Sequence, residues 1–301
     1  MQRRFAIIDV FTDKGAGGNP LAVVLDAEGL SERQMQIIAK GFGFSETTFV
    51  LKPADTANTA RVRIFTPTYE MPFAGHPNVG TALVLAKRAD RPLTSLVFEE
   101  IAGLVPITVS TAAGRPATAE VTAPQPFVRG ANSDPGKIAA MLGISAAEVL
   151  VGSHRPTMAS VGAPFLFAEL DSRESLRQAT PDRSKLVALL RMTETHGLYV
   201  YTKDGSDPDH DIQARMFSRD DTILEDPATG SAAVALVGLL ATLSPMERIE
   251  LTLRIGQGAD MGRPSLLVAR ALKRAGKLVS AHVGGAGVEK KQGTFPLAGE
   301  L

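Results

Sequence analysis

Two stretches of the sequence that match each other decide the fold: HPNVGTA at residues 76–82 and DPATGSA at residues 226–232. Both follow the pattern His/Asp-Pro-x-x-Gly-Thr/Ser-Ala, and they lie about half a chain length apart in a sequence of 301 residues. Each is preceded by a similar strand-like segment, RIFT at 63–66 and RMFS at 215–218. A match of this kind indicates an internal repeat.

A second, weaker match supports the repeat. GNPL at residues 18–21 resembles GAPF at residues 162–165, and the two segments occur in the same order as the first pair. A single short match arises easily by chance, whereas two in the same order indicate duplicated halves.

The segments that follow the main match are apolar on all sides. Residues 232–241 read AAVALVGLLA, and residues 81–86, TALVLA, are nearly as apolar. A helix without a polar face must be buried all round, and these segments are too short to span a membrane. In a chain rich in short strands, we therefore predict one central helix wrapped by curved sheet in each half.

The rest of the chain predicts an α+β class with a mostly antiparallel sheet. SERQ at residues 31–34 fits a capping box and predicts a helix that runs to Ala39 and ends at Gly41. Surface helices are predicted over Pro135–Leu142 and Asp182–Arg191. Segments rich in Val, Ile, Phe or Thr and bounded by Gly, Pro or Asp predict strands. These are Phe5–Phe11, Leu21–Leu25, Thr47–Leu51, Val62–Phe65, Val105–Ser110, Gly197–Tyr201, Ile212–Phe217, Ile249–Ile255 and Ser265–Ala271.

The starts of the two buried helices are the first candidate site. Pro77 and Pro227 suit a first helical turn, where a missing N–H costs nothing, so we predict His76 and Asp226 as the N-cap residues. A helix start carries unpaired N–H groups and about half a positive charge. Two facing starts would therefore bind a carboxylate or stabilise an enolate without a metal or cofactor.

Other residues of these segments fit the same chemistry. Gly75 and Gly230 would let backbone amides approach a ligand closely, and Ser231 adds a hydroxyl donor beside them. Glu46 stands where a loop enters an apolar strand and is the candidate base. Taken singly, each of these polar residues also fits a structural role, so the functional interpretation depends on their combination.

Composition excludes several classes of function. The chain has 32 basic and 32 acidic residues and no basic block, so we expect no nucleic-acid or membrane partner. The first apolar run is only four residues long before Asp9, which is too short for a signal peptide, and no run approaches the ~20 residues of a membrane span. A cytoplasmic location is expected. Cysteine is absent, which excludes disulfides, zinc–thiolate sites and thiol nucleophiles.

Five segments together resemble the PhzF-like family of phenazine-biosynthesis isomerases. They are DVFTDKGAGGNPLAVVL (9–25), GFSETTFVL (43–51), RIFTPTYEMPFAGHPNVGTA (63–82), EDPATGSAA (225–233) and GQGADMGRPSLL (256–267). The resemblance implies a diaminopimelate-epimerase-like fold with two pseudo-symmetric β-barrel-like lobes, each around a central helix, and a site between them. We expect a first lobe of residues 1–115, completed by 288–301, and a second lobe of residues 116–287.

The resemblance also implies an activity and a set of site residues. It implies a cofactor-independent isomerase that acts on trans-2,3-dihydro-3-hydroxyanthranilate or a related small carboxylate, with no metal and with a homodimer as the assembly. Glu46 matches the family's proton-shuttling glutamate. The catalytic partners that it implies are His76, Asp226 and Ser231, and the substrate-binding positions are Asn19, Ser45, Gly75, Thr229 and Gly230.

Several alternatives stay open at this point. An amino-acid racemase or epimerase would need groups other than its usual two thiols, because the chain lacks cysteine. A non-catalytic protein that binds small anions would not need Glu46. A serine hydrolase is disfavoured, since Gly-x-Ser-x-Gly is missing around Ser231. The glycine runs 15–18 and 284–287 lack the context of a dinucleotide site. Four other histidines are interpreted as structural or surface residues: His154, His196, His210 and His282.

Overall fold

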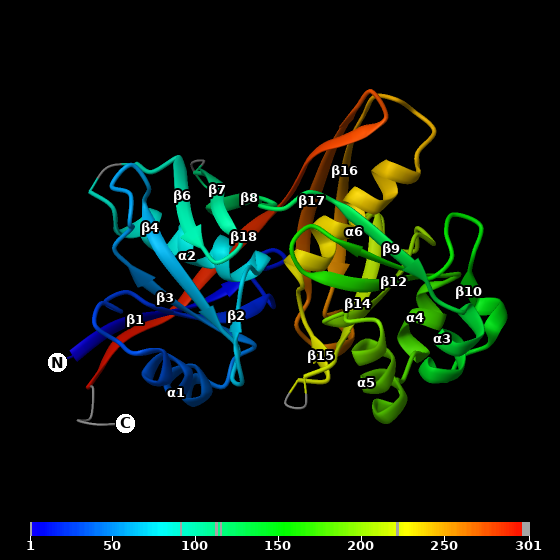
Figure 1. Ribbon diagram of the computed structural model, residues 1–301, viewed down its shortest axis with the longest axis horizontal. Helices are drawn as coiled ribbons and strands as arrows, with labels where there is room; N and C mark the ends of the chain where they lie inside the picture. The colour runs from blue at the N-terminus through cyan, green and yellow to red at the C-terminus, as the bar shows by residue number, and fades with distance from the viewer. Residues whose placement is uncertain (1, 91, 112–113, 115, 221–222, 297–301) are drawn as a thin grey trace.

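A computed structural model describes residues 2–90, 92–111, 114, 116–220 and 223–296. They form two lobes of curved sheet side by side, and each lobe surrounds one long helix (Figure 1). Most strand pairs are antiparallel, which confirms the predicted α+β class. Among these residues no helix has the length and apolar character needed to cross a membrane.

In the first lobe, the sheet surrounds helix α2 (Gly75–Arg88), and helix α1 (Glu32–Phe42) covers β3 and β4 from outside. Its strands are β1 (Gln2–Val10), β2 (Asn19–Val24), β3 (Glu46–Leu51), β4 (Ala60–Phe65), β5 (Glu70–Met71), β6 (Ser95–Glu100), β7 (Gly103–Ser110) and β8 (Thr118–Thr122). The predicted capping box at Ser31 is present, but α1 ends at Gly43 rather than Gly41. Gly43 adopts the left-handed conformation, with φ of 68°, that closes a helix.

The second lobe repeats this plan around helix α6 (Gly230–Leu243). Its strands are β9 (Val128–Asn132), β10 (Val149–Leu150), β11 (Thr157–Ser160), β12 (Pro164–Leu170), β13 (Gly197–Thr202), β14 (Ile212–Ser218), β15 (Glu225–Asp226), β16 (Ile249–Gln257) and β17 (Ser265–Arg274). Helices α3 (Pro135–Leu142), α4 (Arg173–Gln178) and α5 (Arg183–Met192) pack on one side. Each predicted strand overlaps an observed one, and α3 and α5 confirm two predicted helices.

One long strand, β18 (Lys277–Pro296), joins the two lobes. Its first part pairs with β17 of the second lobe, its middle with β8, and its last part with β1 of the first lobe. Figure 1 shows it in red, running from the second lobe back to the chain's starting point. The lobe boundary predicted at 287/288 falls inside this strand, where its pairing with β1 begins at Gly287.

The duplication is visible in matching ion pairs. Arg63 on β4 binds both carboxylate oxygens of Glu70 on β5, at 2.6 and 2.5 Å. Arg215 on β14 binds both oxygens of Glu225 on β15 in the same way, at 2.8 Å each. The RIFT and RMFS segments are therefore equivalent in structure. The weaker match is equivalent too, because its two segments lead into β2 and β12.

The helix starts differ from the prediction in the first lobe. Helix α2 begins at Gly75 with Ala74 as its N-cap, so His76 is the second helical residue and not the cap. Ala74 has no side-chain oxygen to cap with, and the N-terminal N–H groups of α2 are left for another partner. Pro77 stands in the first turn, as predicted.

The prediction for the second lobe is also wrong. Helix α6 begins at Gly230 with Thr229 as its N-cap, so Asp226 precedes the helix by four residues. Asp226 instead ends the short strand β15, where it pairs with Met216 of β14. The backbone pairing continues to that point, and the helix starts only after Pro227. Gly75 and Gly230 are thus structural counterparts, because each is the first residue of its helix. The two seven-residue sequence matches, which align Gly80 with Gly230, are therefore offset relative to the helices.

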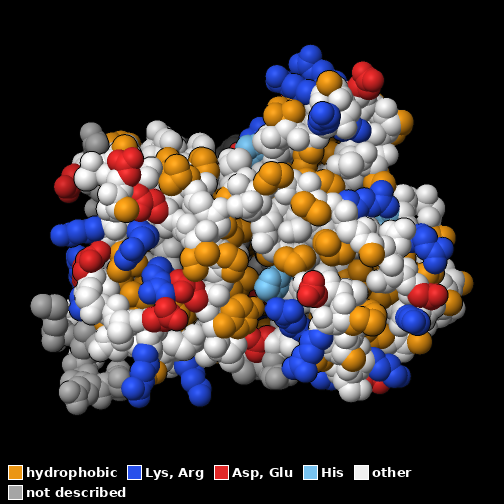
Figure 2. Space-filling view, in the orientation of Figure 1, with side chains coloured by type: hydrophobic (Ala, Val, Ile, Leu, Met, Phe, Trp, Pro, Cys, Tyr) orange, Lys and Arg blue, Asp and Glu red, His pale blue; other side chains and the backbone are white. Residues whose placement is uncertain are grey.

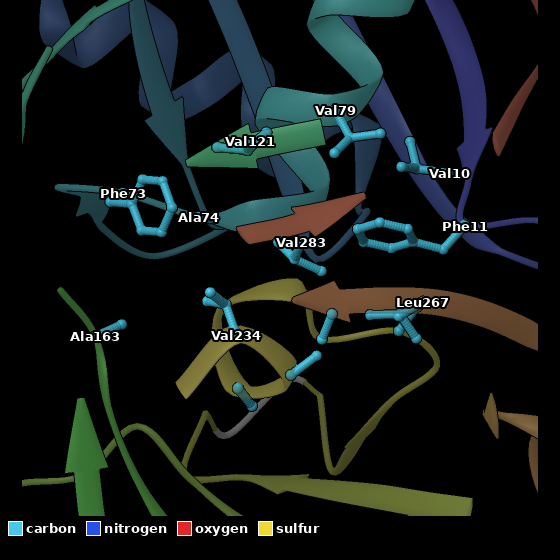
Figure 3. Packing of buried hydrophobic residues seen from close by; sticks show 14 of the residues in the cluster. Val10, Phe11, Phe73, Ala74, Val79, Val121, Ala163, Val234, Leu267 and Val283 are labelled. Carbon is cyan, nitrogen blue, oxygen red and sulfur yellow. The ribbon is translucent and has the colours of Figure 1, made fainter. Parts of the chain in front are cut away.

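The two lobes share one hydrophobic core. Figure 3 shows Phe11 of the first lobe next to Leu267 of the second, with Val79 of α2 and Val234 of α6 on either side of β18. All four are fully buried members of one cluster. This shared packing fixes how the two helix starts face each other.

Candidate active site

A pocket lies between the lobes and has about 590 Å³ of empty space, its open mouth included. Ser45, Glu46, Gly75 and His76 line it from the first lobe. Asp226, Thr229, Gly230 and Ser231 line it from the second. On the face shown in Figure 2, hydrophobic side chains gather along the junction of the lobes.

The starts of α2 and α6 meet backbone to backbone in this pocket. A Cβ built on Gly75 would lie 2.8 Å from both Cα and C of Gly230 and 3.0 Å from N of Ser231. Only glycine permits this approach. Neither N-cap residue makes a side-chain hydrogen bond to its helix, so both starts offer their N–H groups and their partial positive charge to the pocket.

Glu46 and His76 are in direct contact beside these helix starts. Oε2 of Glu46 lies 3.4 Å from Nε2 of His76, and the two side chains are 15% and 4% exposed. Within the described residues, neither atom has a hydrogen-bond partner of good geometry. Buried polar atoms in native proteins are nearly always hydrogen-bonded, so two orphans at one point indicate a place for a ligand.

Burial shifts both groups toward their neutral forms. It raises the pKa of Glu46 to about 8, and the nearby negative charge of Asp226 adds to the increase. Burial alone lowers the pKa of His76 to about 3. At neutral pH the pair therefore holds a carboxylic acid beside a neutral imidazole, and a carboxylate formed here is a stronger base than an exposed one.

Asp226 is held by hydrogen bonds from both lobes. Its Oδ1 accepts a 2.7 Å bond from the amide of Asn19, and its Oδ2 accepts a 2.5 Å bond from the hydroxyl of Thr229. Burial raises the pKa of Asp226 to about 6, while these donors oppose the increase. The Asn19 amide also lies 3.5 Å from Nδ1 of His76. A continuous polar path thus connects Glu46, His76 and Asp226.

Gln257 on β16 shapes the segment that carries Asp226, and sequence analysis did not identify it. Its Nε2 donates to the backbone oxygen of Asp226 at 2.8 Å, and its Oε1 accepts from the backbone N–H of Thr229 at 3.2 Å. The hydroxyl of Tyr199 donates to the same Oε1 at 3.1 Å. Gln257 and Tyr199 are fully buried, so they fix the entry into α6 rigidly.

The pocket is also lined by residues that sequence analysis did not assign to the site. Tyr69, Phe165, Met216 and His196 all line it. His196 was interpreted as structural or surface. The signal for it was in the duplication, because His196 precedes β13 just as Ser45 precedes β3.

The predicted site residues are largely brought together. Eight of them line the pocket, and Asn19 lies behind it in hydrogen-bond contact with Asp226. In the part of the chain described, no group of three His, Asp or Glu side chains is placed to hold a metal ion.

Comparison with protein families gives one match over nearly the whole chain. A family model described as phenazine biosynthesis-like protein matches residues 8–293. An uncharacterized isomerase of Mesorhizobium japonicum is 38% identical over 97% of this chain and 98% of its own length. The trans-2,3-dihydro-3-hydroxyanthranilate isomerase of Pseudomonas chlororaphis is 36% identical over 97% of this chain and 99% of its own length.

Solved structures share the fold. A PhzF-family phenazine biosynthesis protein of Bacillus anthracis superposes with a TM-score of 0.87 at 25% identity, over 99% of this chain and all of that one. A hydroxyproline epimerase of Agrobacterium vitis has a TM-score of 0.65 at 13% identity, over 97% and 92% of the two chains. The second match concerns the fold alone. Together they confirm the predicted two-lobed architecture.

Proposed function

Because this chain belongs to the phenazine biosynthesis-like family and several of its relatives are named isomerases, we propose that it moves one proton within a small carboxylate. The proposed substrate is trans-2,3-dihydro-3-hydroxyanthranilate or a close analogue of it. The observation that carries the proposal is the buried contact between Glu46 and His76 beside two facing helix starts. Buried groups with shifted pKa values in a pocket are typical of catalytic sites.

In the proposed reaction, Glu46 acts first as base and then as acid. As a carboxylate it takes a proton from one carbon, and the electron pair of that C–H bond moves into the substrate's conjugated system. The resulting carboxylic acid returns the proton at another carbon. The net change is a shift of one proton and one double bond. A pKa near 8 makes Glu46 a stronger base than an ordinary carboxylate, at the cost of a smaller ionised fraction at pH 7.

The surrounding groups stabilise the charge that this transfer creates. Negative charge on the substrate faces the N–H groups at the starts of α2 and α6 and the hydroxyl of Ser231. Nε2 of neutral His76 stays 3.4 Å from Oε2 of Glu46, while its Nδ1 faces the Asn19 amide. The substrate's own carboxylate binds best while Glu46 is protonated, since the pocket then holds one negative charge fewer.

A hydrolase mechanism is not supported by the same geometry. Within the described residues, the Ser231 hydroxyl has no hydrogen bond to His76, whose Nε2 faces Glu46 instead. A serine nucleophile needs such a base contact. The two-thiol mechanism of a racemase is impossible, because the chain contains no cysteine.

The proposal is tested by incubating the purified protein with trans-2,3-dihydro-3-hydroxyanthranilate and following its proton NMR spectrum. The expected result is consumption of the compound by wild type and a rate at least ~10²-fold lower for Glu46→Gln, which keeps the shape and removes the base. Equal rates for both proteins would contradict the role of Glu46. Absence of turnover by wild type would contradict this substrate.

A further inference from the structure

His196 is a half-buried pocket residue with unused hydrogen-bonding capacity. Like Oε2 of Glu46 and Nε2 of His76, its Nδ1 is buried without a hydrogen-bond partner among the described residues. The Glu46 and His76 atoms, both from the first lobe, face each other, whereas His196 lines the pocket from the second lobe. An orphaned polar atom of this kind needs an explanation, and a missing ligand supplies one.

A comparison with His154 separates a structural histidine from this one. Nδ1 of His154 lies 2.7 Å from the backbone oxygen of Arg155, and Nε2 lies 2.7 Å from the hydroxyl of Tyr201. Both ring nitrogens of His154 are therefore satisfied inside the protein. The ring of His196 has no comparable pair of partners, although its Nδ1 is buried.

The ring of His196 is held in place by its surroundings. The His196 backbone N–H donates to the oxygen of Pro164 at 2.8 Å, and its own oxygen accepts from the N–H of Arg219 at 3.2 Å. The imidazole stands 6.2 Å from the ring of Phe165, at an angle of 48°. Phe165 also lines the pocket, so the two rings form one wall of it.

The duplication makes His196 the structural counterpart of Ser45. Thr47 of β3 pairs with Phe65 of β4, and Leu198 of β13 pairs with Phe217 of β14. Since the two phenylalanines are equivalent, the residue two positions before Leu198 is the counterpart of Ser45. His196 thus lines the pocket from the second lobe in the position that Ser45, the neighbour of Glu46, has in the first lobe.

The surroundings of His196 define what it would bind. Phe165, Met216 and Met71 give the pocket apolar surface, whereas Tyr69, Ser218 and Asp220 add polar groups to it. Burial and the charge of Arg219 lower the pKa of His196 to about 4, so the imidazole is neutral at physiological pH. A neutral imidazole offers one donor and one acceptor but no charge to attract a second carboxylate. The expected partner is therefore an uncharged polar group on a largely apolar body.

We propose that His196 is a specificity-determining residue that hydrogen-bonds a hydroxyl or amino group on the substrate other than its carboxylate. The proposal rests on the proposed function, in which the carboxylate binds near the facing helix starts. The substrate then has its reacting carbon atoms near Glu46 and its second polar group at His196.

Binding of stable aromatic acids tests this assignment without any turnover. The probes are benzoate, 3-hydroxybenzoate and 3-aminobenzoate, titrated calorimetrically into wild type, His196→Ala and His196→Asn. His210→Asn is the matched control, because His210 bonds Asp207 outside the pocket. Wild type is expected to bind one of the substituted acids about tenfold tighter than benzoate, as one well-made hydrogen bond allows. His196→Ala should lose this preference while its affinity for benzoate stays within about twofold. His196→Asn, with an amide near the place of Nδ1, should retain part of it.

The outcomes separate this proposal from the proposed function. A preference that survives in His196→Ala would overturn the assignment, and so would an equal loss of affinity for all three acids, which marks a structural role. Equal binding of the three acids by wild type would overturn the assignment and leave the isomerase proposal standing. Failure of wild type to bind any of them would overturn the small-carboxylate proposal and this one together.

Discussion

The amide of Asn19, on the first lobe, donates a 2.7 Å hydrogen bond to Oδ1 of Asp226, on the second, and both side chains are buried. Nδ2 of Asn19 also donates to the backbone oxygen of Ala228 at 3.1 Å, and Oδ1 accepts from the hydroxyl of Ser45 at 3.1 Å. These contacts fix which end of the amide faces Asp226. Asn19 is therefore the polar link between the two halves of the site.

Replacement of Asn19 by aspartate should disrupt the site. Asn19→Asp removes the donor to Asp226 and places a second carboxylate against it in a buried position, where like charges repel strongly. We expect kcat/KM to fall by at least ~10²-fold and the melting temperature to fall more at pH 8 than at pH 5, because protonation at lower pH relieves the repulsion. The control is Asn58→Asp, which puts a carboxylate beside Glu99 near the surface. Equal effects of the two variants would contradict the account.

Glu46 should lower the stability of the protein at high pH. Its pKa is raised from 4.5 to about 8 in the folded state, so the folded protein binds this proton more tightly than the unfolded chain does. The associated stability is complete below pH 4.5 and is lost as the pH rises through 8. Glu46→Gln has no proton to lose. We expect it to exceed wild type in free energy of unfolding by about 2 kcal/mol or more at pH 8 and to differ little at pH 4. Urea titrations at both pH values measure this, and a pH-independent difference would contradict the shift.

Arg263 should act as a positioning residue for the first lobe. Its Nε donates to the backbone oxygen of Gly18 at 2.8 Å, and its Nη2 donates to Asp9 at 2.8 Å, so it ties the second lobe to the residue before Asn19. Arg263→Gln should lower kcat/KM about tenfold and shift the pH–rate profile, because the Asn19 contact to the acid groups is loosened. The control, Arg270→Gln, removes an ion pair to Glu120 outside the pocket and should leave the profile unchanged. A shared loss of stability without any change in profile would contradict the positioning role.

Gly75 should tolerate no side chain. A methyl group there would lie 2.8 Å from backbone atoms of Gly230, which cannot rotate away. Gly75→Ala should force the helix starts apart, destabilise the protein by about 1–3 kcal/mol and abolish binding of carboxylates. Gly41→Ala is a matched control, because Gly41 lies within α1 with open space around it and should gain up to about 1 kcal/mol. Unchanged carboxylate binding by Gly75→Ala would contradict the site.

Much of the fold was predictable because the chain repeats itself. The apolar segments after the two matches were predicted to be buried helices, and both lie in buried helices, as the 0% exposure of Leu236 and the 1% exposure of Val84 show. The polar set of the site was also predictable, since Glu46, His76 and Asp226 lie in segments that resemble a known family. The return of residues 288–301 to the first lobe was predicted only from the resemblance to a known family, and one continuous strand β18 through both lobes was not predicted. Its pairing on both sides involves contacts between residues far apart in the sequence, which local patterns do not encode.

The errors have physical causes. Proline suits the first turn of a helix, but it is equally compatible with the end of a strand. Before Pro227, Asp226 pairs with Met216, so this segment ends a strand instead of beginning a helix. His196 gave no signal of its own, because a lone histidine before a strand is usually structural. Only the equivalent strand pairing in the two halves identifies His196 as the counterpart of Ser45.

The central claim is that Glu46 carries the migrating proton, and deuterium incorporation tests it most directly. The protein is incubated in deuterated water with trans-2,3-dihydro-3-hydroxyanthranilate, and the product is analysed by NMR for wild type and Glu46→Gln. Wild type is expected to convert the compound, with any deuterium confined to the carbon that receives the proton, and Glu46→Gln is expected to be at least ~10²-fold slower. Turnover by Glu46→Gln at the wild-type rate, with the same label pattern, would contradict the central claim.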